Sequence, residues 1–166
     1  MRRFKSSGTV RAAVFSACAV LAATLIVTPS ASAASWNGIE PLKSTRADVI
    51  KILGEPIGES IDGVLRFKVM GGSVQVSFVS DKFVTAKKLR PELAGTVLEI
   101  VLQHEHSNET PESMNLLHNK SFVRDETKTT TIFRNIKEGI IYTFMEDKLK
   151  STRYTFADSQ LTRARR

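Results

Sequence analysis

Cysteine is nearly absent from this chain of 166 residues. The one cysteine, Cys18, has no second cysteine to pair with, so no internal disulfide can constrain the fold. A cysteine-stapled scaffold is therefore excluded. Hydrophobic residues make up 42% of the chain and charged residues 25%, which is ordinary for a globular protein and argues against global disorder. The length fits one domain or two very small ones.

Acidic residues are absent before Glu40. Four basic residues precede an apolar run over residues 12–27, and this run is followed by Ala31-Ser32-Ala33, a small-residue cleavage pattern. The apolar run is shorter than the roughly 20 residues that a membrane-spanning helix needs. We therefore interpret residues 1–33 as a Sec signal peptide.

Neither a complete twin-arginine motif nor a convincing lipobox accompanies this segment. Phenylalanine follows Arg2-Arg3 directly, and the residues before Cys18 are a poor lipobox inside the apolar run. We expect export to the periplasm or the extracellular medium, with no lipid anchor and no transmembrane segment after cleavage. Residues 34–166 have 20 basic and 17 acidic residues, so the net charge of +7 falls to +3. This small charge excludes nucleic acid as the expected partner.

Catalytic sequence motifs are also missing. The chain has no GxSxG elbow, Walker or dinucleotide glycine motif, or HExxH helix. Ser73 follows two glycines and fits a hairpin turn. Carboxylates are scattered: Glu146 and Asp147 lie in a predicted turn, and Asp125 and Glu126 precede a predicted strand. We expect no enzymatic activity and no cofactor.

The first half of the mature chain predicts a short helix followed by strands. Thr45 and Asp48 fit a capping box, and Gly54 and Pro56 end the helix. Alternating apolar and polar residues around Gly71-Gly72 predict a β-hairpin. The remaining expectations are strands over 65–69, 74–78 and 96–103, a turn at Asp81-Lys82 and a polar loop over 85–96.

The second half predicts a similar order of elements. Thr110-Pro111 has the features of a helix start, and the helical pattern continues weakly to His118. Three strands are predicted over 129–136, 140–145 and 149–156. A shift of 66 residues places Phe67 on Phe133 and Asp81-Lys82 on Asp147-Lys148.

We therefore predict an α+β fold built from two helix–strand–strand–strand repeats. The repeats cover residues 34–109 and 110–158, and short helices pack on one face of an antiparallel sheet. Residues 159–166 are expected to form a flexible basic tail.

The segment from Pro41 to Val49, with Leu53-Gly54, resembles uncharacterised secreted bacterial proteins that have this PLKSTRADV…LG pattern. Gly139 to Tyr142 occupies the place of a C-terminal strand motif in those proteins. The short helix before an antiparallel sheet is similar to the fold of the BamE/SmpA lipoproteins and the β-lactamase inhibitory protein, which is a tandem duplication. The resemblance implies an α+β layer fold and no catalytic residues.

His104, Glu105 and His106, with Glu109 nearby, form the main concentration of metal-capable side chains. Residues i and i+2 of a strand share a face, so His104 and His106 with Glu109 are weak candidates for a zinc site. The alternative is a solvated pair of histidines at the end of a strand.

Weak candidates for contacts with a protein partner are two tyrosines and a basic cluster. Tyr142 and Tyr154 lie on predicted strands, and a sheet covered by helices on one face leaves the other free for a partner. Lys87, Lys88 and Arg90 lie in the predicted polar loop. The arginines of the tail could contact anionic lipid or a wall polymer.

These observations predict an exported, non-enzymatic interaction or envelope-associated protein, with another envelope or secreted protein as its partner. The alternatives are a hydrolase inhibitor similar to the β-lactamase inhibitory protein, and a metal-dependent enzyme that uses His104 and His106.

Overall fold

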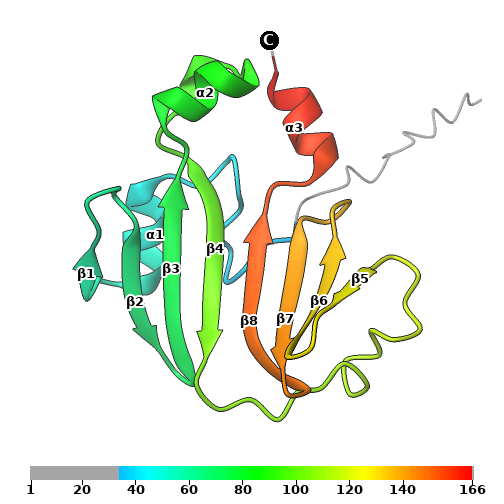
Figure 1. Cartoon of the computed structure of the whole chain (residues 1–166). Helices are drawn as coiled ribbons and strands as arrows, with labels where there is room; N and C mark the ends of the chain where they lie inside the picture. The colour runs from blue at the N-terminus through cyan, green and yellow to red at the C-terminus, as the bar shows by residue number, and fades with distance from the viewer. Residues whose placement is uncertain (1–33, 166) are drawn as a thin grey trace, which may run out of the picture.

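Residues 34–165 are described by the computed structural model, so the predicted signal peptide lies outside the described residues. The fold is α+β, with one antiparallel sheet of eight strands in the order β1-β2-β3-β4-β8-β7-β6-β5 (Figure 1). The strands are β1 (Gly58–Glu59), β2 (Leu65–Val69), β3 (Gly72–Phe78), β4 (Val97–His104), β5 (Val123–Glu126), β6 (Thr130–Asn135), β7 (Ile140–Met145) and β8 (Lys148–Thr155).

Helix α1 (Arg46–Leu53) covers one face of the first half of the sheet. The capping box is present, because the Thr45 side chain accepts a hydrogen bond from the Asp48 N–H and Asp48 accepts one from the Thr45 N–H. Val49 is fully buried in a cluster with strand residues that include Leu65 and Phe67. Figure 1 shows α1 behind β2 and β3. The helix predicted over 45–53 is confirmed.

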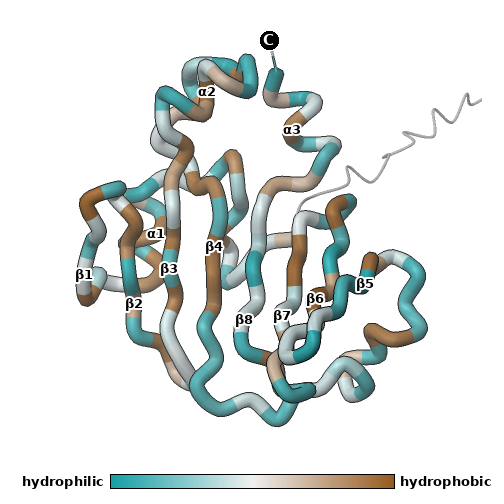
Figure 2. Tube along the Cα trace, in the orientation of Figure 1, coloured by the Kyte–Doolittle hydropathy of each residue, from teal (hydrophilic) through white to brown (hydrophobic). Residues whose placement is uncertain are grey.

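The second half of the sheet buries its own cluster on the same face. Phe133 and Phe144 make an edge-to-face contact with ring centroids 5.8 Å apart, and Leu116 and Leu149 complete the buried set. The connection between β4 and β5 contributes Leu116 to this cluster. Figure 2 shows hydrophobic residues along β4 and β7 and hydrophilic residues in the connection that follows β4.

The segment predicted as a turn and a polar loop over 81–96 folds differently. It contains helix α2 (Asp81–Lys87) and the 3₁₀ helix η1 (Pro91–Leu93). The Ser80 hydroxyl caps α2 by accepting a hydrogen bond from the Phe83 N–H at 3.2 Å. The sequence predicted a turn at Asp81-Lys82, and Ser80 was overlooked as a helix cap, so the prediction was wrong here.

The C-terminal segment also differs from the expected basic tail. Residues Asp158–Ala164 form helix α3, and buried Ala164 packs in a third cluster with Val84, Leu89 and Leu93. Figure 1 shows α2 and α3 beyond the ends of the strands. The sequence predicted a tail because most of this segment is polar, whereas Ala164 lies in the third cluster and Leu161 packs against it.

The second predicted helix is absent from the described residues. Residues 111–115 form turns, and Asn115 has a left-handed φ of 52°, which ends any helical turn begun at Thr110. Pro111 and Leu116 are buried, so the segment covers the sheet without regular structure. Thr110 and Pro111 therefore begin a single turn and not a helix.

The two halves of the sheet have mirrored strand orders about the β4–β8 pair. However, Asp81 opens α2 whereas Asp147 lies in the two-residue turn between β7 and β8. A single 66-residue shift therefore does not superpose these elements, and the duplication stays a prediction. The predicted strands correspond to β2, β3, β4, β6, β7 and β8, whereas β1 and β5 were not predicted.

Within residues 34–165, no helix has the length and apolar character required to cross a membrane.

Candidate interaction surfaces

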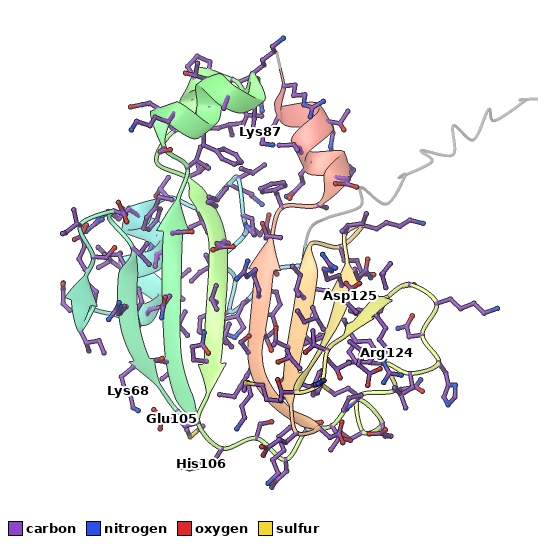
Figure 3. The ribbon with its side chains drawn as sticks, viewed as in Figure 1. Lys68, Lys87, Glu105, His106, Arg124 and Asp125 are labelled. Atoms are coloured by element: carbon purple, nitrogen blue, oxygen red, sulfur yellow. The ribbon has the colours of Figure 1, made fainter. Side chains whose placement is uncertain are left out.

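Side chains of the predicted metal cluster have other partners in the structure. The His104 Nε2 atom lies 3.0 Å from the Thr152 hydroxyl oxygen on β8, and partial burial lowers the pKa of His104. Glu105 pairs with Lys68, and the Glu109 carboxylate accepts a hydrogen bond from Ser113 at 2.7 Å. Figure 3 shows Glu105 beside Lys68.

The strand ends at His104, so the shared-face rule does not extend to His106. Within residues 34–165, no group of three His, Cys, Asp or Glu side chains lies close enough to hold a metal ion. The structure therefore gives no support to a metal site made by His104, His106 and Glu109.

Several of the scattered carboxylates lie close together in the structure. Glu126, Glu146 and Asp147 line one open pocket of about 410 Å³ with a run of threonines. Glu126 also pairs with Arg124, and Asp125 pairs with Arg134 across β5 and β6. Figure 3 labels Arg124 and Asp125 on β5. These contacts fit ion pairs at the edge of a sheet.

Tyr142 and Tyr154 lie on the covered face of the sheet. The Tyr142 ring is 5.7 Å from the Phe122 ring and packs against the Phe133 cluster, whereas Tyr154 packs against the α1 cluster. Burial raises the pKa of both tyrosines. Each tyrosine therefore packs against one cluster of the core, and neither supplies an aromatic side chain to the uncovered face of the sheet.

The opposite face of the sheet has no helix over it in the part of the chain that the structure describes (Figure 1). Strand register places one residue from each of seven strands in a line across it. This line consists of Arg66, Gln75, Val101, Arg153, Ile141, Arg134 and Val123. A second line beside it consists of Lys68, Ser73, Gln103, Ser151, Thr143, Ile132 and Asp125.

We call these two lines the open face. All of its side chains are exposed or half-buried, whereas the lines on the other side include fully buried Phe67, Val76 and Phe144. Its arginines are partly neutralised: Arg153 lies 3.5 Å from Glu99, and Arg134 pairs with Asp125. Arg66 has neither an ion pair nor a side-chain hydrogen bond within residues 34–165.

Lys87, Lys88 and Arg90 meet basic residues from distant parts of the chain. An antiparallel bridge joins Leu89 to Arg165, and the Arg90 N–H donates a hydrogen bond to the Ala164 carbonyl oxygen at 3.0 Å. The ends of α2 and α3 therefore lie together. Figure 3 places Lys87 at this end of the molecule.

We call this surface the basic tip. Its cations are Lys43, Lys87, Lys88, Arg90, Arg163 and Arg165. A pocket of about 260 Å³ is lined by Lys43, Arg90, Arg163, Gln160 and three apolar residues. In the sequence, the basic residues near α2 and those of the tail form separate clusters. Lys43 and Gln160 were missed, because no sequence spacing indicates that these two residues neighbour either cluster.

Comparisons with protein-family models, with curated proteins and with solved structures find no match to this chain. The resemblance to secreted bacterial proteins and to the BamE/SmpA fold stays a hypothesis based on the sequence.

Proposed function

We propose that this protein is an exported, non-enzymatic interaction module that binds another envelope or secreted protein through the open face. The observation that carries the proposal is the line of residues in register across seven strands, which no helix of residues 34–165 covers while the opposite face is packed. The predicted signal peptide supports the compartment, and the lack of catalytic motifs in the sequence supports the non-enzymatic role.

The chemistry of the open face suits a protein partner. Arginine alternates with apolar side chains in the sequence Val101, Arg153, Ile141, Arg134 along the central strands. Arginine is enriched at protein interfaces, because it combines an apolar stem with several hydrogen-bond donors. Neighbouring serine, threonine and glutamine side chains add donors and acceptors whose desolvation costs less than that of charged groups.

A photo-crosslinking experiment in the cells that make the protein tests this proposal. A photoreactive amino acid replaces Gln75 or Thr143 on the open face, or Lys51 on α1 as the matched control on the opposite side. We expect a discrete protein adduct from the two open-face positions and none from position 51. Equal adducts from all three positions, or none at positions 75 and 143, would contradict the proposal.

Inhibition of a secreted hydrolase is one specific form of this binding. The mirrored strand order about the β4–β8 pair favours it, because the inhibitory protein that the sequence resembles is a tandem duplication. Assays of β-lactamases and proteases with the purified protein separate it from binding without inhibition. Stoichiometric loss of hydrolase activity is expected only if the alternative holds.

A further inference from the structure

The basic tip concentrates positive charge beyond the carboxylates around it. Two of its six cations pair with acidic residues, Lys43 with Glu40 at 2.9 Å and Arg90 with Glu92 at 3.5 Å. The side chains of Lys87, Lys88 and Arg165 have no ion pair or hydrogen bond within residues 34–165. Positive charges held close together in the folded state repel one another. An anion bound among them offsets this electrostatic repulsion.

The arrangement is fixed by packing. Leu89, which follows Lys88 and precedes Arg90 in the sequence, is completely buried, and Val84, Leu93 and Ala164 belong to the same cluster. The Leu89–Arg165 bridge and the Arg90–Ala164 hydrogen bond hold the two chain segments in register. The cations at the ends of α2 and α3 are therefore presented by a preformed surface.

Helix ends explain part of this charge. Lys87 and Arg163 lie in the last turns of α2 and α3, where a cation interacts favourably with the helix dipole. That effect does not account for Lys43 or Arg90, which belong to connecting segments and line the same pocket as Arg163. Gln160, whose Nε2 donates to the Pro41 carbonyl oxygen at 3.4 Å, ties the N-terminal segment to α3 beside these cations.

We propose that the basic tip binds a phosphate group in the pocket lined by Lys43, Arg90 and Arg163. Guanidinium groups match the oxygens of phosphate in planar, paired hydrogen bonds, and a lysine adds a point charge. The group can belong to a soluble phosphorylated molecule or to the headgroup of an anionic phospholipid. This proposal is independent of protein binding by the open face.

Calorimetric titration of the full chain with inorganic phosphate and pyrophosphate tests the soluble source. Cosedimentation with phosphatidylglycerol vesicles tests the headgroup, and phosphatidylcholine vesicles control for surface binding without net charge. We expect saturable binding to at least one phosphate probe below about 10 mM. The affinity should decrease as salt increases, since the contact is electrostatic.

Matched variants locate the site. The double variant Lys43→Gln/Arg90→Gln removes two pocket cations, and Lys51→Gln/Lys120→Gln removes two exposed cations outside both the basic tip and the open face. We expect at least about a tenfold loss of affinity in the first and less than about a twofold loss in the second. Arg163→Gln, which removes the third pocket cation from the exposed side of α3, repeats the test if the first variant folds poorly by circular dichroism.

Binding only to phosphatidylglycerol vesicles assigns a phospholipid headgroup, and binding to soluble phosphates assigns a soluble molecule. The proposal is overturned if none of the phosphate probes binds, if phosphatidylcholine vesicles bind equally well, or if the tip and control variants lose affinity equally.

Discussion

Gly72 shows how a residue without a side chain brings two strands together. It begins β3, is buried, and lies opposite His104 of β4. A Cβ at this position would overlap the carbonyl oxygen of Gln103, which is backbone and cannot swing away. Its neighbour Gly71 has a left-handed φ of 83°, but a Cβ added to Gly71 would meet no atom within 4 Å. The two glycines of the hairpin are therefore needed for different reasons.

Substitution of these two glycines should have unequal effects. Gly71→Ala should cost about 1 kcal/mol of unfolding free energy, the penalty of a left-handed conformation. Gly72→Ala should cost about 3 kcal/mol or more, because β3 and β4 must separate to admit the methyl group. Urea unfolding of both variants measures the difference. Equal losses would show that close approach of the strands does not decide the role of Gly72.

Helix α1 is the element whose sequence signals and structure agree best. Thr45 and Asp48 form both hydrogen bonds of the capping box, and the Gly54 N–H donates to the Ile50 carbonyl oxygen at the other end. The hydrogen bond from the Thr45 N–H, with that from its hydroxyl, lowers the pKa of the Asp48 carboxyl. The cap therefore depends on the ionised carboxylate.

The stability of Asp48→Asn should depend on pH. A carboxyl whose pKa is lower in the folded state stabilises the fold above its unfolded pKa of about 3.9, and this contribution is lost as pH falls through the folded pKa. Asp48→Asn should therefore be less stable than the unsubstituted protein at pH 7, and the gap should narrow below about pH 4. Urea unfolding across pH measures it. Asp62→Asn is the matched control because the Asp62 side chain has no hydrogen bond or ion pair within residues 34–165, and we expect it to leave stability unchanged.

Local signals identified strands more reliably than helices in this chain. Alternation over 65–69 and 74–78 predicted β2 and β3, because one face of each strand is buried and the other is solvated. Strand β5 has four exposed residues and shows no alternation that would identify it. Helices α2 and α3 depend on packing against each other's segments through Leu89 and Ala164, and no local pattern encodes that contact.

The whole molecule is one sheet that carries two clusters on the same face. Pairing of β4 with β8 joins the halves, and half-buried Tyr154 of β8 packs against the α1 cluster. Trp36, the one tryptophan, packs against that same cluster. Because the hydrogen bonds of the sheet are continuous across the junction, we expect both halves to unfold together.

Phe144→Ala tests this cooperativity from the far half. Removal of a fully buried ring should cost about 3–5 kcal/mol of unfolding free energy. Trp36 fluorescence and far-ultraviolet circular dichroism should both report the same shift of a single transition. A tryptophan transition that keeps its midpoint while the circular dichroism signal changes would show that the halves unfold separately.

The sequence by itself determined the α+β class, six of the eight strands and the capped helix α1, because alternation, capping and turn residues act over a few neighbouring positions. Only the tertiary structure decided which side chains meet. It placed Tyr142 and Tyr154 on the covered face, left His104, His106 and Glu109 outside any three-ligand metal group within residues 34–165, and put the arginines of the open face in line. It also assembled the basic tip, since the contact between Leu89 and Arg165 follows from how the whole chain folds back on itself.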